Sequence, residues 1–592
     1  MAKLNEVRRF EDVTVNSNID LTVELNKREV EKDVFEYEFL LNWDEEQAKD
    51  PESRVSMHWN LPCVDVQYMW HPNCRPRRVL DAFWRLNVES YLSGSAPLAL
   101  LFNSDDMNTY TFTTDEVKKV TSVSFGVDDG KNTIAGDISM GLQQFVGKSS
   151  DRLLVRADFR RIPYYKALDD VRIWWEKVLD LEPMPVPDIA RKPLYNTWYS
   201  FTQNVNAKEL EEELRQGKEL GMEMCILDDG WHTNDNNRGY GYTGDWEVCT
   251  DKIPDIKEHV KRVHAMGMKY MMWYSVPFVG FYSKNWERFK DKILFTIDRN
   301  SVGVLDPRYP EVREHLIRIY ENALREYDLD GIKLDFIDRF IMPANVKVSP
   351  EMDYLCVQEA TERLMTDIMH RLHAIKDNLT IEFRQRYIGP AMRRYGNMFR
   401  VADCPNDIAT NRMGIVDIRL ISGKTAAHAD MITWHDDETV EDAALQILNV
   451  MFGVVQFSRR LVSMRPDHKA MTTFWLKFAK DNIRILQESE FVAYEPHFLY
   501  PVIKAFDEKE EIIGVYANKK VICPDMSKER SRIINATKQP VVYLSVEQDN
   551  TVDMVTYDCM GNVTAREKLL LHKGCNEVTV PRSGLLEMVK MS

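Results

Sequence analysis

The feature that most constrains the fold is an alternation that begins at Leu194, where short apolar runs start to alternate with longer helical stretches. Such repeated β-α units are typical of a parallel sheet whose strands are connected by helices. The apolar runs number eight, which is the number that closes a (β/α)₈ barrel. We therefore expect a central TIM barrel with strands near residues 195–200, 223–228, 269–275, 331–336, 380–384, 398–403, 428–433 and 453–457.

Helix signals occur between and after these strands. Asn206 is a good N-cap for the run that follows it, in which Leu210 and Leu214 lie four residues apart on one face. Pro310 opens another helical run, because the first position of a helix tolerates proline. Residues 471–488 are expected to form the closing helix of the barrel.

The regions on both sides of the barrel have the period of β-strands. Aromatic and acidic residues alternate in 34–39, and 122–127 alternates in the same way before a hairpin turn at 128–132. Four prolines between residues 183 and 193 indicate a linker, since proline cannot donate to a ladder. The predicted fold class is α/β, with an N-terminal β-sandwich at 1–182, the catalytic (β/α)₈ barrel at 190–488 and a C-terminal all-β sandwich at 490–592.

Composition narrows the class of ligand. The chain has 592 residues and a net charge of −16, which argues against a nucleic-acid surface, because phosphate binding needs basic patches. Nine scattered cysteines without a CxxC pair favour neither a disulfide framework nor a zinc site. No run approaches the length of a membrane span, so we expect a soluble protein with no membrane contact. It would be cytoplasmic as given, or periplasmic or secreted if a leader has been removed, and a homo-oligomer is left open.

The strand at 331–336 carries the first candidate for chemistry. Lys333 and Asp335 are two residues apart and share a face, so an inward face would place an ammonium beside a carboxylate. The positive neighbour keeps Asp335 ionised, and an ionised carboxylate can attack an anomeric carbon. The alternative is a structural ion pair at the end of the barrel.

A second candidate is Asp228-Asp229, which follows the apolar run 224–227. The oxygens of two ionised carboxylates only accept hydrogen bonds, which suits vicinal sugar hydroxyls. Ligation of Mg²⁺ or a turn or helix cap are the alternatives. Trp231 is expected either to stack on a sugar or to plug the rim of the barrel.

Asp403 is the third carboxylate, and we expect it to donate and accept the proton. Ala402 and Cys404 flank it in a poorly solvated setting, which predicts a raised pKa. Strict alternation would put Arg400 on the opposite face, so both reach one site only if the strand end bends. Further candidates for substrate binding are Trp198, Trp273, Glu382, Arg384 and Asp430.

Two more features of the sequence bear on metal binding and on the mouth of the pocket. His428 and His435 lack ligand spacing, so we expect no metal and no cofactor. The segment from Trp59 to Pro72, with Trp70, is rich in aromatic residues and proline, and is a candidate loop at the mouth of the pocket.

Five stretches in order resemble the α-galactosidase clan, and most closely glycoside hydrolase family 36 (melibiase-like). They are Leu227-Asp228-Asp229-Gly230-Trp231, Gly244-Asp245-Trp246, 264–270, 330–335 and 400–403. The resemblance covers about residues 190–440.

The resemblance implies a retaining mechanism with Asp335 as nucleophile and Asp403 as acid/base, their carboxyl groups about 5–5.5 Å apart. It also implies that Asp228 and Asp229 bind hydroxyls around C4 and C6, which favours galactose. Lys333, Trp198, Arg400 and Asp430 match residues of the family as well. The expected activity is that of an exo-acting α-galactosidase, and the expected partner is an oligosaccharide or α-galactoside.

One departure affects specificity. Many family members carry a segment rich in cysteine and glycine after the fifth strand, on the C2 side of the sugar, where this chain has Ile381-Glu382-Phe383-Arg384-Gln385-Arg386. An α-glycosidase of other C2 or C4 specificity, such as an α-N-acetylgalactosaminidase, is therefore an alternative. So is a galactosyl transglycosidase of the raffinose-synthase kind. A metal-dependent barrel lyase or isomerase and a sugar-binding protein without catalysis are more distant rivals.

Overall fold

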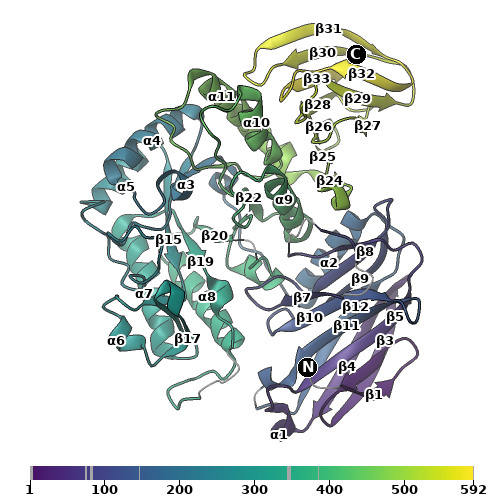
Figure 1. Ribbon diagram of the computed structural model, residues 1–592, viewed down its shortest axis with the longest axis vertical. Helices are drawn as coiled ribbons and strands as arrows, with labels where there is room; N and C mark the ends of the chain where they lie inside the picture. Colours follow the sequence, from purple (N-terminus) through teal and green to yellow (C-terminus); the bar gives the residue numbers. More distant parts are fainter. Residues whose placement is uncertain are drawn as a thin grey trace.

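A computed structural model describes residues 4–73, 77–80, 85–145, 147–342, 348–384 and 386–590. Figure 1 shows a barrel flanked by two β-regions, with the N-terminal sheets at the lower right and the C-terminal sheets at the upper right. The predicted α/β class, with a central (β/α)₈ barrel between β-rich parts, is confirmed. Cys74, one of the nine cysteines, and Gln385 lie outside the described residues.

The N-terminal region is a sandwich. In its described residues two antiparallel sheets have the strand orders β1-β2-β5-β11-β10-β7 and β3-β4-β12-β9-β8-β6. Side chains from both sheets form one core, in which the rings of Trp59 and Phe112 lie 5.1 Å apart. The elements are β1 (Asn5–Arg9), β2 (Thr14–Ser17), β3 (Leu21–Glu31), β4 (Val34–Trp43), α1 (Glu45–Ala48), β5 (Arg54–Pro62), β6 (Tyr68–Trp70), β7 (Leu86–Ser90), β8 (Leu98–Phe102), β9 (Asn108–Thr114), β10 (Thr121–Asp128), β11 (Thr133–Gly141), β12 (Ser150–Asp158) and α2 (Tyr164–Val178).

The barrel sheet is parallel and closed. Its order in the described residues is β22-β21-β20-β19-β15-β14-β13-β23, and the bridges His428–Val454 and Ile432–Phe457 join the two ends. All eight predicted runs therefore contribute a strand. The strands are β13 (Leu194–Asn196), β14 (Met224–Leu227), β15 (Lys269–Ser275), β19 (Gly331–Asp335), β20 (Thr380–Arg384), β21 (Met398–Arg400), β22 (Ala426–His428) and β23 (Gln456–Phe457).

Helices surround this sheet (Figure 1). The Asn206 side chain accepts from Glu209 N at 2.9 Å, and Pro310 is the first residue of its helix, so both predicted starts are confirmed. The helices are α3 (Trp198–Phe201), α4 (Ala207–Leu220), α5 (Ile256–Ala265), α6 (Trp286–Phe289), α7 (Pro310–Tyr327), α8 (Val357–His373), α9 (Ile408–Ser422), α10 (Val440–Asn449) and α11 (Pro466–Asp481). A small sheet, β16 (Phe278–Gly280), β17 (Ile293–Ile297) and β18 (Val302–Leu305), follows β15.

Several predicted bounds were too long at the carboxyl ends of the strands. The first strand ends at Asn196 rather than near residue 200, and the sixth at Arg400 rather than 403. The seventh lies at Ala426–His428, before most of the predicted range 428–433. Apolar character continues into the buried loops at the mouth of the barrel, so hydropathy does not mark the last ladder hydrogen bond. The closing helix begins earlier than expected, at Pro466, and a π-helical turn (Arg484–Glu488) follows it.

The C-terminal region consists of β-sheets. In the described residues their orders are β24-β25-β26-β28-β33-β30-β31 and β27-β29-β32. The strands are β24 (Glu490–Tyr494), β25 (Val502–Phe506), β26 (Glu510–Val515), β27 (Val521–Ile522), β28 (Arg530–Asn535), β29 (Val541–Val546), β30 (Asn550–Tyr557), β31 (Val563–Leu571), β32 (Gly574–Thr579) and β33 (Leu585–Lys590). Among the residues described, none of the helices has the length and apolar character that a membrane crossing requires.

Candidate active site

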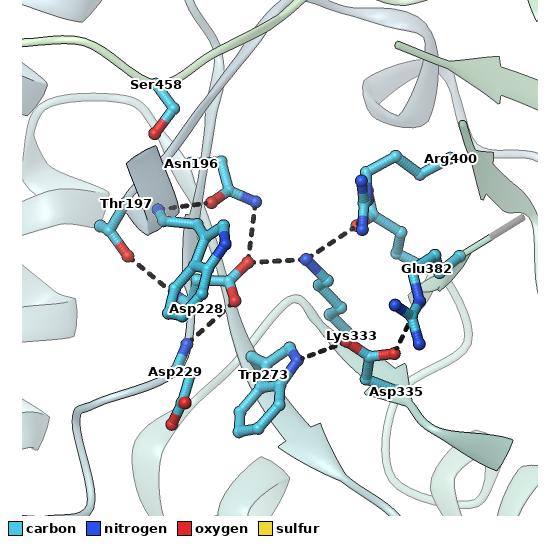
Figure 2. A network of polar contacts seen from close by, with 12 residues as sticks. Asn196, Thr197, Asp228, Asp229, Trp273, Lys333, Asp335, Glu382, Arg400 and Ser458 are labelled. Atoms are coloured by element: carbon cyan, nitrogen blue, oxygen red, sulfur yellow. Dashed lines mark hydrogen bonds and ion pairs between the residues drawn. The ribbon is translucent and has the colours of Figure 1, made fainter. Parts of the chain in front are cut away.

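Asp335 is the last residue of β19 and lies at the mouth of the barrel (Figure 2). Its Oδ1 accepts from Tyr387 Oη at 2.6 Å and from Phe336 N at 2.8 Å, and Arg384 Nε lies 3.1 Å away. Its Oδ2 accepts from Trp273 Nε1 at 3.0 Å. Burial raises the pKa of this carboxyl, but the charges of Arg384 and Lys333 outweigh burial and hold the pKa well below its ordinary value. Asp335 is therefore an ionised, oriented carboxylate.

Lys333 points to the same side of β19 and joins two further carboxylates (Figure 2). Its Nζ donates to Asp228 Oδ2 at 2.6 Å and lies 3.7 Å from Glu382 Oε1. Glu382 has no exposed surface, and burial raises its pKa. Two pairs of residues were predicted to share a strand face, Lys333 with Asp335 and Glu382 with Arg384. All four side chains lie at the site.

Asp228 and Asp229 lie directly after β14 but have different partners. Asp228 Oδ2 also accepts from Asn196 Nδ2 at 3.0 Å, and its backbone N donates to Thr197 Oγ1 at 2.9 Å. Asp229 Oδ2 accepts from Gln203 Nε2 at 2.7 Å. Figure 2 shows the two side chains pointing apart. The donors Asn196 and Lys333 at Asp228, and Gln203 at Asp229, offset the repulsion between the adjacent charges.

Arg400 holds the third carboxylate in place. Its Nη2 donates to Asp403 Oδ1 at 2.9 Å, and its Nη1 donates to Asp430 Oδ1 at 2.6 Å. Because β21 ends at Arg400, the alternation of strand faces does not extend to Asp403, and both residues reach one site. Asp430 is completely buried and also accepts from Tyr199 Oη at 2.9 Å, so it supports Arg400 and does not face an open pocket.

The expectation of a raised pKa at Asp403 was wrong. Its side chain is 48% exposed and paired with Arg400. Burial does raise the pKa of Asp403, but the charges of Arg400 and Arg384 outweigh burial and lower the pKa below its ordinary value, while the charge of Asp335 acts in the opposite direction. The effect of Asp335 on Asp403 indicates that the two carboxyl groups share one electrostatic environment.

The aromatic candidates differ in their placement. Trp273 donates a hydrogen bond to Asp335. Trp198 instead begins the short helix α3 after β13, and the Arg238 guanidinium lies over its ring, with Cζ 5.1 Å from the ring centroid. Trp231 has no exposed surface and donates to the Trp273 carbonyl at 3.0 Å, which fits a plug and contradicts a stacking surface for sugar.

The hypothesis that residues 59–72 line the mouth of the pocket was wrong. Trp59 belongs to the sandwich core, and Trp70 Nε1 donates to Asp417 on α9, at 3.1 Å. Another N-terminal loop reaches the site instead: Tyr91 Oη donates to the Asp338 carbonyl and Ser93 Oγ to the Ile337 carbonyl, each at 3.0 Å. The carbonyls belong to the turn that follows Asp335.

Four polar side chains of the site were not found from the sequence. Tyr387 lies beyond the end of β20, directly after the segment 381–386 that differs from the family, and strand periodicity no longer applies there. Gln203, Tyr199 and Asn196 follow or end the first strand and carry no motif of their own. Asn196 alone had a usable signal, because it ends the apolar run 194–196 beside the run that ends at Asp228.

Within the described ranges, no group of three or more His, Cys, Asp or Glu side chains is arranged to hold a metal ion. Asp228, which a metal-dependent rival would use as a ligand, is paired with the Lys333 ammonium.

An N-terminal sandwich, a barrel with ionised carboxylates at its mouth and a C-terminal β-region define a three-part (β/α)₈-barrel protein. The chain belongs to the Melibiase family, whose sequence model matches residues 187–488.

Among curated proteins, it is 30% identical over 146 residues to alpha-galactosidase 2 of Pediococcus pentosaceus, which is 24% of this chain and 20% of that protein. It is 29% identical over 156 residues to alpha-galactosidase Mel36A of Lactobacillus acidophilus, 25% of this chain and 21% of the relative. The aligned segment thus spans about a fifth of the length of these relatives.

Solved structures show the same fold over the whole chain. The GH36 alpha-galactosidase AgaA of Geobacillus stearothermophilus superposes with a TM-score of 0.66 at 16% identity, covering 100% of this chain and 86% of that one. The alpha-galactosidase of Lactobacillus brevis gives 0.65 at 15% identity, with 100% and 84% covered. Variants of AgaA have been solved in complex with raffinose and with stachyose.

Proposed function

We propose that this protein is a retaining, exo-acting α-glycoside hydrolase of the α-galactosidase type, with Asp335 as nucleophile and Asp403 as acid/base. The observation that carries the proposal is the ionised Asp335 at the end of β19, which accepts hydrogen bonds from Trp273 and Tyr387 and whose charge raises the pKa of Asp403. A retaining glycosidase needs two such carboxyl groups about 5–5.5 Å apart on opposite sides of the scissile bond.

In the first step Asp335 attacks the anomeric carbon while Asp403 gives its proton to the leaving oxygen. Asp403 must be protonated for this step. A sugar in the site displaces water from around Asp403, and the negative charge of Asp335 also favours the protonated form.

In the second step Asp403 accepts a proton from the water that attacks the glycosyl-enzyme. Asp335 is then an uncharged ester, so its repulsion of a negative Asp403 has gone, and the pKa of Asp403 falls. Arg400, at 2.9 Å, stabilises the ionised form, which is the form that a base requires. The same residue can therefore change from acid to base.

The preference for galactose rests on Asp228 and Asp229 and on the family. The two carboxylates lie at the mouth of the barrel and can only accept hydrogen bonds while ionised, as a pair of sugar hydroxyls requires. Relatives of the chain are alpha-galactosidases, and two AgaA variants bind raffinose and stachyose. We propose α-galactosides, including oligosaccharides of this kind, as the substrate class.

An alternative specificity at C2 is favoured by one observation. Arg384, which stands in the segment that departs from the family, places its guanidinium beside the nucleophile. A different C2 substituent, such as an N-acetyl group, would meet that cation. A transglycosidase would use the same intermediate with a sugar as acceptor.

The test uses aryl α-glycosides that differ at C2, C4 and C6. The aryl α-galactoside should be hydrolysed with the α-anomer as the first product, and Asp335→Asn should lose at least about 10³-fold in kcat, because a neutral amide is a very poor nucleophile. Asp403→Ala should still cleave an aryl glycoside with a good leaving group, which departs without a proton. It should no longer cleave one with a poor leaving group, which needs the proton. Wild-type turnover by Asp335→Asn would contradict the assignment, and product analysis with and without a sugar acceptor separates hydrolysis from transfer.

A further inference from the structure

The two oxygens of Asp335 have unequal surroundings. Oδ1 has three contacts: the Tyr387 hydroxyl at 2.6 Å, the Phe336 amide at 2.8 Å and the Arg384 Nε at 3.1 Å. For Oδ2, the part of the chain that the structure describes supplies a single hydrogen bond, from Trp273 Nε1 at 3.0 Å. Figure 2 shows the Trp273 ring beside the Asp335 carboxylate, with its nitrogen directed at that group.

We propose, on the basis of the proposed function, that Tyr387 and Arg384 are positioning residues that fix Oδ1 as the non-attacking oxygen, so that Oδ2 forms the bond to the anomeric carbon. An oxygen that accepts two hydrogen bonds and lies beside an arginine cation has little lone-pair density left for a further partner. Oδ2 has one donor and keeps the free lone pair that attack requires.

The backbone on both sides of Asp335 is arranged for these contacts. Phe336 has φ +63° and Arg386 has φ +97°, conformations that non-glycine residues rarely adopt and that cluster at functional sites. The turn at Phe336 brings its amide back to the preceding carboxyl group, and the turn at Arg386 immediately precedes Tyr387. The Phe336 amide also donates to Tyr387 Oη at 3.0 Å, which fixes the hydroxyl oxygen and leaves its proton for Asp335.

Contacts from outside the barrel hold both turns. Tyr91 and Ser93 bond to the carbonyls of Asp338 and Ile337, and Ser95 N donates to the Arg386 carbonyl. The Arg384 guanidinium also packs over the Phe336 ring, 4.9 Å from its centroid. Burial raises the pKa of Tyr387 far above its ordinary value, so the hydroxyl stays a donor throughout the working pH range.

The charge on Asp335 changes in both steps. When the Oδ2 lone pair bonds to C1, the bond from C1 to the leaving oxygen breaks and that oxygen takes the proton of Asp403. Oδ1 then becomes the carbonyl oxygen of an ester. In the second step a water oxygen bonds to C1, Asp403 takes the water proton, and the Oδ2–C1 electron pair returns to the carboxylate.

The returning charge is shared by Oδ1, which meets the Tyr387 hydroxyl and the Arg384 cation. These contacts are stronger in the second transition state than in the uncharged ester, so they accelerate hydrolysis of the intermediate. A tyrosine with a merely structural role would not act selectively on this step.

The experiment compares Tyr387→Phe with wild type on an aryl α-galactoside whose leaving group is good enough that hydrolysis of the intermediate limits turnover. We expect kcat to fall roughly tenfold to a hundredfold, the effect of losing one hydrogen bond to a charged group, and KM to fall with it because the intermediate accumulates. The burst of released phenol should persist. The matched control is Tyr395→Phe, which removes a hydroxyl bonded to Thr366 in the same region, and its kcat should not change.

Arg384→Lys is the second variant, and it retains a cation while shortening the reach to Oδ1. It should slow the same step, with a smaller fall in kcat than Tyr387→Phe. A Tyr387→Phe enzyme with unchanged kcat, or with raised KM and no slower hydrolysis of the intermediate, would overturn the inference while leaving Asp335 as the nucleophile. Full activity of Asp335→Asn would instead overturn the proposed function.

Discussion

At the scale of single residues, Arg400 is the strongest of the charges that lower the pKa of Asp403. It is buried, and it bonds both to Asp403, at 2.9 Å, and to the buried Asp430, at 2.6 Å. Its charge, together with that of Arg384, outweighs the effect of burial on Asp403 and lowers the pKa of that carboxyl. In the proposed mechanism Asp403 must be protonated before it can act as the acid. The arginine holds it toward its ionised form in the free enzyme, which favours the proposed role as base.

Arg400→Met should therefore move the basic limb of the pH profile. Asp403 donates only when protonated, so kcat/KM for a substrate with a poor leaving group falls as the pH rises through the pKa of Asp403. Without the arginine that pKa rises, and the limb should shift to higher pH. The measurement is kcat/KM against pH with a poor leaving group. Arg393→Met, a buried arginine paired with Glu176, is the control and should leave the limb in place.

At the scale of elements, the loop after β14 depends on one glycine. Gly230 has φ +109°, and a Cβ there would lie 2.5 Å from Gln203 Cα and 2.6 Å from Gln203 O. Gln203 in turn donates to Asp229 at 2.7 Å. The close approach of two backbones therefore positions the pair of carboxylates that we assign to substrate hydroxyls.

Gly230→Ala should disturb this arrangement. The new Cβ would clash with backbone that cannot rotate away, and we expect KM for an aryl α-galactoside to rise at least about tenfold, together with a loss of stability of about 1–3 kcal/mol. Gly574→Ala is the control, since Gly574 has φ +98° and nothing lies within 4 Å of its Cβ position. The control variant should show the destabilisation that comes from alanine at a positive φ, and its KM should not change. Equal KM values in both variants would contradict a positioning role for Gly230.

The elements also show what sequence could and could not predict. Eight apolar runs and two helix starts were correct, because burial of parallel strands and capping are local effects read from neighbouring residues. Asp228 and Asp335 were singled out because they stand at the ends of such runs, and Lys333 because it shares a strand face with Asp335. Tyr387 and Gln203 were missed, since the turns that carry them are fixed by tertiary contacts, such as the approach of Gln203 to Gly230. The pKa of Asp403 was misjudged for a similar reason: its chain neighbours are apolar, and its pairing with Arg400 depends on where β21 ends.

At the scale of the whole molecule, one buried ion pair joins the three parts of the chain. Arg78, from the N-terminal region, donates to Asp417 Oδ2, on α9 of the barrel, at 2.6 Å, and both side chains are fully buried. Asp417 Oδ1 also accepts from Trp70 Nε1 at 3.1 Å and from Tyr500 Oη, in the C-terminal region, at 2.5 Å. Among the described residues, each hydrogen bond that this carboxylate accepts therefore crosses a boundary between parts of the chain.

Asp417→Asn should uncouple these parts. An uncharged amide leaves the Arg78 cation buried beside a weaker partner, and breaking one side of a buried pair costs about 3–5 kcal/mol. Because that free energy is shared among three regions, we expect a lower midpoint in calorimetry and a single transition that separates into two. Lys477→Met removes an exposed partner of Asp481 and should change the midpoint little, since such pairs contribute about 0.3–0.5 kcal/mol.

Since Tyr91 and Ser93 connect the N-terminal region to the turn after Asp335, the Asp417→Asn enzyme should lose activity along with the first of its two transitions. Activity that survives until the second transition would show that the barrel works without the sandwich docked against it.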